Sequence, residues 1–224
     1  MPRFIFIPSA TSTFPIADIL SEYKFENNVL DTVGSEDGSA TSLTYASGLV
    51  GQTGVFNGSS SRVLMPGDFI PYFSEFSFTI LLKATDTLSE YRAFGFANNT
   101  NMPFILLRLN NSVSGRIGLL ARDNVSAKEI ITDAYTPTSW THVTGTFVEN
   151  GDMKLYVNGT LISTLSILDF ATISGNNTIG SNRNGNGQFF KGDLDCLRIW
   201  KKELTASEVS TIATAELAGT DINP

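Results

Sequence analysis

The feature that most constrains this chain is a succession of short apolar runs that begins at Glu22 and continues almost to the C-terminus. Gly, Asn, Asp and Ser interrupt the runs, and apolar residues alternate strictly with other residues within residues 76–80 and 153–157. Such alternation is typical of β-strands with one buried face. The pattern predicts an all-β protein with strands over residues 22–26, 53–57, 61–65, 75–83, 91–97, 103–109, 115–121, 128–132, 140–148, 152–158, 160–165 and 189–200.

Two Asn-Gly pairs predict turns between strands. Asn150-Gly151 and Asn158-Gly159 separate three consecutive apolar runs. Asn and Gly tolerate the left-handed backbone that a two-residue hairpin turn requires. Residues 140–165 are therefore predicted to form a three-stranded antiparallel meander. The pattern within residues 140–148 leaves open which face of that strand meets the core.

The two ends of the chain differ from this β pattern. Thr205 and Glu208 have the spacing of a capping box, and an apolar stripe follows, so one short C-terminal helix is predicted to pack on the sandwich. Residues 218–224 are expected to fray as a tail. Residues 1–20 contain three prolines and are predicted to be an extended arm, which covers a sheet edge of its own domain or reaches a neighbouring subunit. The sandwich domain is expected over residues 21–217.

The charge and cysteine content exclude several classes of function. Lys and Arg number 15 against 22 Asp and Glu, which gives a formal net charge of -7 without a basic run. Nucleic-acid sites need clustered cations, so we expect no nucleic-acid partner. The single cysteine cannot form an intrachain disulfide. The apolar run between Arg3 and Pro8 is too short for a signal peptide, and no stretch approaches a membrane span, so we expect no membrane insertion.

The residues that usually carry catalysis are sparse. His142 is the only histidine and Cys196 the only cysteine, which rules out a closed zinc site. His142 is interpreted as a hydrogen-bonded framework residue and Cys196 as a buried small apolar residue. Glycoside hydrolysis needs two carboxyl groups at a defined separation, and the only acidic strand holds Asp193 and Asp195 without a flanking glutamate. We therefore expect no enzyme.

A series of local motifs resembles one protein family. The motifs are Tyr23-Lys24-Phe25-Glu26-Asn27-Asn28 with Asp31, Gly54-Val55-Phe56-Asn57-Gly58, Phe76-Ser77-Phe78-Thr79-Ile80, Trp140-Thr141-His142-Val143, Leu155-Tyr156-Val157-Asn158-Gly159, Ile179-Gly180, Gly192-Asp193-Leu194-Asp195-Cys196-Leu197-Arg198-Ile199-Trp200 and Leu204-Thr205-Ala206-Ser207-Glu208-Val209. Their order resembles the laminin-G-like branch of the concanavalin A-like lectin and glucanase superfamily, over roughly residues 22–213. The resemblance implies a two-sheet antiparallel β-sandwich, a jelly roll, with one concave face. This architecture serves enzymes, lectins, adhesins and structural parts, so it does not name a ligand.

The resemblance also implies a structural calcium ion. Laminin-G-like domains often hold one, and Glu26, Asp31 and Asp195 match the motifs that supply its oxygen ligands. In the alternative interpretation, Asp31 caps a turn while Asp195 pairs with Arg198 or faces water. The last strand of such domains usually carries an acidic residue where Cys196 stands here, so no role of that residue carries over. The superfamily's laminarinase-like glycosidases use an E-x-D-x-x-E strand, which this chain lacks.

Glycan binding calls for aromatic faces beside planar amides or arginines. The candidate residues are Tyr91 and Arg92 in one segment and Asn182, Arg183 and Asn184 in another, with a further candidate loop over residues 98–101. An ordinary flexible turn is the alternative for residues 181–187, because Gly and Asn form turns in any protein. Trp140 and Trp200 are expected in the core.

These observations favour a non-catalytic binding or structural module. We expect a virion surface component, a bacteriophage head decoration or tail-fibre protein, that binds cell-surface glycans. The arm would contact other virion or assembly proteins, and the chain could form a homo-oligomer. The alternatives are a free lectin-like carbohydrate-binding protein, cytoplasmic or released without a signal peptide, and a divergent glycoside hydrolase.

Overall fold

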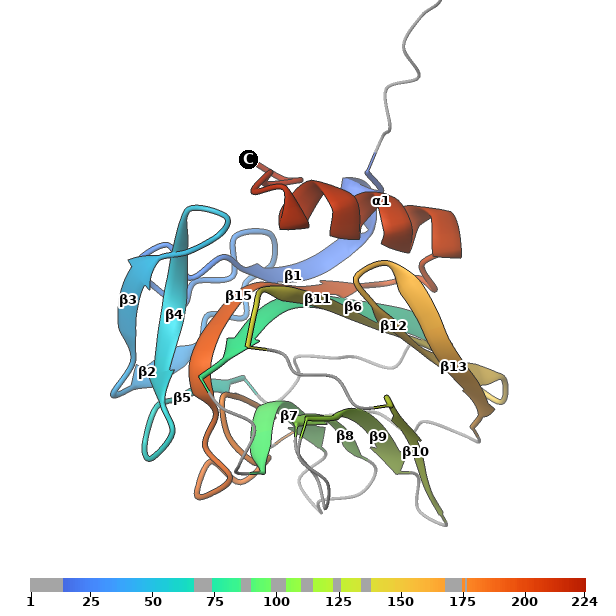
Figure 1. Cartoon of the computed structure of the whole chain (residues 1–224), viewed down its shortest axis with the longest axis horizontal. Helices are drawn as coiled ribbons and strands as arrows, with labels where there is room; N and C mark the ends of the chain where they lie inside the picture. Colours follow the sequence, from blue (N-terminus) through green and yellow to red (C-terminus); the bar gives the residue numbers. More distant parts are fainter. Residues whose placement is uncertain are drawn as a thin grey trace, which may run out of the picture.

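A computed structural model describes residues 14–66, 74–85, 90–97, 104–109, 115–122, 126–133, 138–167, 175 and 177–224. Two antiparallel sheets lie face to face, and one helix covers the outer side of the first sheet (Figure 1). This arrangement confirms the predicted all-β sandwich with a short C-terminal helix.

The first sheet has the strand order β13-β12-β11-β6-β15-β4-β3, and β1 pairs with the second half of β15. Its strands are β13 (Thr160–Ser166), β12 (Asp152–Val157), β11 (Thr141–Val148), β6 (Glu75–Ala84), β15 (Lys191–Trp200), β4 (Gln52–Asn57), β3 (Thr44–Ser47) and β1 (Ile19–Tyr23). The second sheet has the order β10-β9-β8-β7-β14-β5-β2. Its strands are β10 (Ala127–Ile131), β9 (Ile117–Arg122), β8 (Phe104–Leu109), β7 (Tyr91–Ala97), β14 (Asn177–Ile179), β5 (Arg62–Met65) and β2 (Ser39–Thr41).

The N-terminal boundary differs from the prediction. The first strand is β1 at residues 19–23 and not at 22–26, because Phe25 and Asn27 adopt positive φ angles that end the extended backbone. Most of the predicted arm, residues 1–13, lies outside the described residues. Its last part consists of the 3-10 turn η1 (Ile16–Asp18) and the beginning of β1. The short strands β2, β3 and β14 were not predicted.

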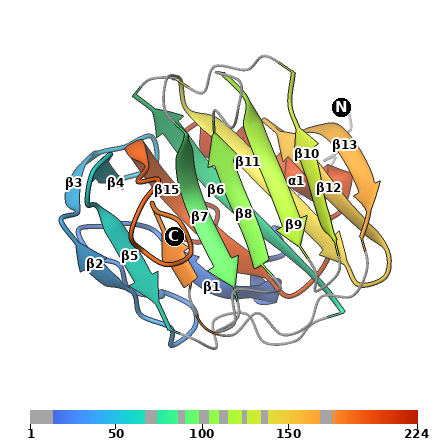
Figure 2. The same cartoon turned by 90° about the horizontal axis from the view of Figure 1, so that it is seen from below.

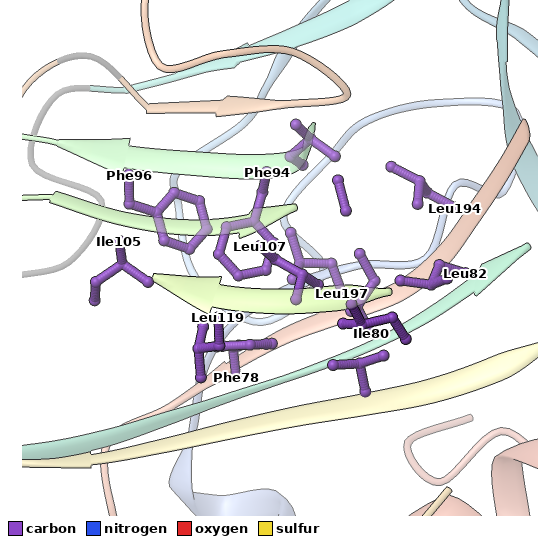
Figure 3. Packing of buried hydrophobic residues seen from close by; sticks show 14 of the residues in the cluster. Phe78, Ile80, Leu82, Phe94, Phe96, Ile105, Leu107, Leu119, Leu194 and Leu197 are labelled. Atoms are coloured by element: carbon purple, nitrogen blue, oxygen red, sulfur yellow. The ribbon is translucent and has the colours of Figure 1, made fainter. Parts of the chain in front are cut away.

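The main core fills the space between the two sheets. Alternate residues of β6, among them Phe78, Ile80 and Leu82, meet Phe94 and Leu107 from the second sheet (Figure 3). Burial of such side chains stabilises the fold by about 1.5–3 kcal/mol each.

Strand β11 is buried on both faces. Its residues Val143 and Phe147 point into the main core, and His142 lies on the other face, where it contacts Glu216 of α1 (Ala206–Leu217). This settles the face that the sequence pattern left open.

The helix forms a third layer over the first sheet. Thr205 caps α1, and the reciprocal bonds with Glu208 confirm the predicted capping box. A second apolar cluster joins helix, sheet and tail through Trp200, Val209 and Ile222. The prediction that residues 218–224 fray is wrong, because Ile222 is buried in this cluster. Lys24 and Arg198 also bind the carboxylate of Asp221 at 2.8 and 3.0 Å.

The predicted meander of β11, β12 and β13 is confirmed. Asn158 and Gly159 both have positive φ, as a two-residue turn requires. Asn150 also has positive φ, but Gly151 does not, and this turn is one residue longer than predicted. Within the described part of the chain, no helix has the length and apolar character to span a bilayer.

Candidate functional site

The outer face of the second sheet is crossed by the segment that connects β14 to β15. Ile105 and Leu107 of β8 point into the core, so Phe104, Leu106 and Arg108 point outward. Figure 2 shows residues 181–191, in orange, lying against β5 and β7 on this side. We call the outward-pointing side chains of the second sheet, together with residues 181–191, the loop face.

The loop over residues 181–187 is held by its own hydrogen bonds. Asn182 donates its backbone N–H to the carbonyl of Gly187 at 2.9 Å, and its side-chain oxygen accepts from the backbone of Asn186 at 3.1 Å. Gly185 has φ +69°, and a methyl group on it would lie 3.1 Å from Leu64 Cδ2. The predicted residue Asn182 therefore organises the loop, and Asn184 lies exposed on it.

Arg183 contacts an aromatic side chain of the second sheet. Its guanidinium carbon is 4.5 Å from the centroid of the Phe104 ring. Phe104 belongs to a small apolar cluster with Ala97 and Leu106 that is separate from the main core. Burial lowers the pKa of Arg183, and the nearby charge of Arg122 lowers it further. The loop is thus built onto the sheet through a cation–π contact.

A hollow of about 400 Å³ opens beside this loop. Three segments distant in sequence form it: the β4–β5 turn, the beginning of β7, and the residues that lead into β15. Its lining residues are Asn57, Gly58, Glu90, Tyr91, Gln188, Phe189 and Lys191. Gln188 is exposed and Phe189 half-buried, so an amide and an aromatic side chain lie together at one open depression. This combination suits a ligand that has both hydroxyl groups and apolar ring faces.

The prediction that Tyr91 offers an open stacking face is wrong. Tyr91 is 4% exposed, and its ring meets that of Phe190 edge-on with centroids 6.0 Å apart. A register shift between Arg92 and Phe94 turns Tyr91 toward the core. Arg92 is also buried and binds the carboxylate of Glu90 at 2.6 Å, so it positions Glu90 at the rim of the hollow. Burial lowers the pKa of Arg92.

The three predicted calcium ligands do not form one cluster. No group of three or more His, Cys, Asp or Glu side chains that could hold a metal occurs among the described residues. The carboxylate of Asp31 accepts backbone hydrogen bonds of 2.9–3.3 Å from Glu22, Val33, Gly34 and Glu36. Asp31 therefore organises a loop, as the alternative interpretation held.

Asp195 and Glu26 approach the same turn at residues 48–51. A methyl group on Gly48 would lie 3.2 Å from Asp195 Oδ2, and Glu26 accepts a hydrogen bond from the Gln52 backbone at 2.9 Å. Asp195 is fully buried, and its Oδ2 has no hydrogen-bond partner among the described residues. Burial raises the pKa of Asp195 to about 8. An unsatisfied buried carboxylate oxygen beside a second carboxylate fits a divalent cation, although Asp31 takes no part.

The other side chains that could take part in catalysis, His142, Cys196 and Asp193, are buried or paired with other side chains. His142 Nε2 lies 3.2 Å from the carboxylate of Glu216, and both side chains are fully buried. Cys196 is buried, and burial raises the pKa of its thiol well above the usual value. Asp193 lies 3.5 Å from the ammonium group of Lys83. None of these residues lines the hollow.

The fold and its motifs agree with a known superfamily. A family model described as the concanavalin A-like lectin/glucanases superfamily matches residues 57–210. The chain belongs to this superfamily. A search of curated protein sequences gave no significant match.

Several solved structures share the architecture of this chain. One of them is domain 4 of AbnA, an extracellular arabinanase from Geobacillus stearothermophilus, which was solved in complex with arabinotriose. Its sequence is 23% identical to this chain, and the superposition has a TM-score of 0.73. The match covers 88% of this chain and 98% of that chain. The binding domain of botulinum neurotoxin serotype D is 19% identical, with a TM-score of 0.71 and 89% of this chain covered. The binding domain of Paraclostridial Mosquitocidal Protein 1 is 19% identical, with a TM-score of 0.74 and 91% covered. The chain spans about half of each toxin domain, 51% and 55% respectively. At these sequence identities, the similarity shows only that the lectin-like fold is shared.

Proposed function

We propose that this chain is a non-catalytic carbohydrate-binding module whose site is the hollow beside the loop face. The observation that carries the proposal is the lining: an exposed amide and a half-buried aromatic ring share one open depression with Glu90 and Lys191. Two structures of the same fold support it, because they were solved with arabinotriose and with N-acetylneuraminic acid. The buried Asp195 and the ion-paired Asp193 give less support to a divergent glycoside hydrolase.

Each group in the hollow has a distinct role toward a sugar. The Gln188 amide donates to and accepts from hydroxyl groups, and Glu90 accepts from them. Arg92 holds Glu90 in place, so the orientation of this acceptor is set before a ligand arrives. Phe189 offers apolar surface to the ring of the sugar.

Binding to a printed array of neutral and acidic glycans tests the proposal. We expect the wild-type protein to retain at least one glycan, and Gln188→Ala to weaken that binding by about tenfold, the loss of one or two ligand hydrogen bonds. Thr164→Ala, an exposed position on β13, is the matched control and should bind as wild type does. If a folded wild-type protein retains none of the glycans on the array, the proposal is wrong.

We also propose that the module works on the surface of a virion, as a bacteriophage head decoration or tail-fibre component. The support comes from the sequence, which predicts an arm that begins at residue 1 and reaches a neighbouring subunit, and from a fold that needs no disulfide. Mass spectrometry of purified particles should detect the chain at a fixed ratio to the capsid protein. Its absence from such particles would favour a free lectin-like protein.

A structural calcium ion is proposed at Asp195 and Glu26 and not at Asp31. Calcium bound there would neutralise the buried carboxylate of Asp195 and fix the turn at residues 48–51. Thermal melting with calcium or with EDTA tests this assignment. We expect calcium to raise the melting temperature of the wild-type protein and of Asp31→Asn, but not that of Asp195→Asn.

A further inference from the structure

Two arginines meet at one aromatic ring on the loop face. Arg122 on β9 is the cross-strand partner of Phe104 on β8, so the two side chains stand side by side on the same face. Arg183 reaches the same ring from the loop, with its guanidinium carbon 4.5 Å from the centroid. Both arginines are half-buried and therefore remain within reach of a ligand.

A third arginine approaches from β5. A methyl group on Gly185, two residues beyond Arg183, would lie 3.3 Å from Arg62 Cδ and 3.4 Å from its Nε. The Nε atoms of Arg62 and Arg122 are buried without a hydrogen-bond partner among the described residues. Buried donors are normally satisfied, so these two positions suit an additional acceptor.

The local charge contrasts with that of the whole chain. The strands of the second sheet, all described, hold a single acidic residue, Glu129, against Arg62, Arg92, Arg108 and Arg122. Lys128 of β10 is the cross-strand partner of the core residue Ala121 and therefore lies on the other face of the sheet. Glu129 is engaged by Arg108, and Glu90, which precedes β7, is engaged by Arg92. The chain as a whole carries -7. The loop face thus concentrates positive charge on an acidic protein.

Gathering like charges on a partly desolvated surface is unfavourable unless an anion joins them. The lowered pKa of Arg183, which follows from burial and then from Arg122, agrees with this juxtaposition. Guanidinium groups bind carboxylate and sulfate oxygens through paired hydrogen bonds.

We propose that Arg62, Arg122 and Arg183 bind the anionic group of an acidic glycan, a carboxylate or a sulfate carried on a sugar ring. This inference rests on the proposed carbohydrate-binding function and names the charge class of its ligand. The hollow, with Gln188 and Glu90, would take a neutral part of the same glycan chain.

Affinity electrophoresis in gels that contain one polymer each tests the inference. The polymers are dextran, polygalacturonate, dextran sulfate and polyglutamate, which separate neutral sugar, sugar carboxylate, sugar sulfate and carboxylate without sugar. We expect polygalacturonate or dextran sulfate to retard the wild-type protein more than dextran and polyglutamate do. The comparison between these two polymers identifies the anionic group.

Variants then locate the site. Arg122→Gln should weaken binding of the acidic polymer by about tenfold, the loss of one charge-assisted pair, and Arg122→Lys should weaken it less. Arg122→Gln keeps the contact between Arg183 and Phe104, so the loop should stay folded. The double variant Lys128→Gln/Lys201→Gln removes two exposed cations elsewhere and should bind as wild type does.

Three results would overturn the inference. In the first, the wild-type protein binds dextran alone. In the second, polyglutamate retards it as much as the acidic sugar polymers do. In the third, Arg122→Gln and Arg183→Gln bind the acidic sugar polymer as wild type does. The first of them would leave the proposed carbohydrate-binding function standing. If the wild-type protein binds none of these polymers and no glycan on the array, both the proposed carbohydrate-binding function and this inference are wrong.

Discussion

The guanidinium of Arg198 on β15 contacts the carboxylate of Glu216 on α1, and both side chains are fully buried. Arg198 also contacts Glu22 of β1 and Asp221 of the C-terminal segment. One arginine therefore joins strand, helix and tail on the outer side of the first sheet. The acidic neighbours raise the pKa of Arg198 although burial would lower it. A charge buried in this way stays favourable only while its partners are present.

Removing one partner should be costly. We expect Glu216→Gln to lower the free energy of unfolding by about 3–5 kcal/mol, because a buried guanidinium is left undercompensated. Urea denaturation followed by circular dichroism measures this change. Lys154→Met breaks the partly exposed pair with Glu203 and should cost at most about 1 kcal/mol. Equal costs for the two variants would contradict the special role of the buried network.

The same network should give a defined response to acid. Burial would raise the pKa of Asp221, but hydrogen bonds from Lys24 and the Asn223 backbone and the charge of Arg198 lower it overall. A depressed folded pKa adds stability above the unfolded value, and that stability is lost as the pH falls through the folded pKa. Asp221→Asn should therefore lose less stability than wild type between pH 7 and pH 3. Parallel urea titrations at the two pH values check this, and identical losses would rule out the linkage.

Local signals in the sequence predicted the parts of the fold that local physics determines. The alternation around Phe78, the turn at Asn158-Gly159 and the capping box at Thr205 depend on a few neighbouring residues, and all three are present. The packing of Ile222 depends on a helix and a strand that must first come together. The prediction of a fraying tail failed for this reason.

The candidate site was harder to predict than the fold. The register shift between Arg92 and Phe94 turns Tyr91 inward, although simple alternation puts it on the other face from Phe94. The hollow joins residues near positions 57, 90 and 188, which no local pattern connects. Arg183 was predicted from its Asn- and Gly-rich loop, but its neighbours Arg62 and Arg122 belong to strands whose pairing only the fold reveals.

Thr205, the N-cap of α1, should make a small contribution to the free energy of unfolding. Thr205→Ala removes the hydroxyl that accepts from the Glu208 backbone and should lower the free energy of unfolding by about 1 kcal/mol. Thr211→Ala, at a half-buried interior position of α1, should leave stability unchanged or raise it slightly because alanine favours helix. Thermal melting of both variants distinguishes the cap from a general effect of threonine. A Thr211→Ala loss equal to that of Thr205→Ala would contradict the assignment.

Gly180 connects the core to the binding hollow. It has φ +78°, and a methyl group there would lie 2.1 Å from a ring carbon of Phe56. Its N–H donates to Ala93 on β7, and its carbonyl accepts from Phe190, the residue after Phe189 in the hollow. Backbone movement at Gly180 would thus be transmitted to one wall of the site.

Gly180→Ala should therefore reduce both stability and glycan binding. We expect a loss of about 2–4 kcal/mol in the free energy of unfolding, since left-handed backbone strain adds to the clash with Phe56. Gly187→Ala is the matched control: its φ is not positive, and the nearest atom to the new methyl group is a side-chain nitrogen at 3.3 Å. Urea denaturation and binding to the array glycan measure the two effects. If Gly180→Ala kept wild-type affinity in its folded fraction, the wall formed by residues 188–191 would not depend on this glycine.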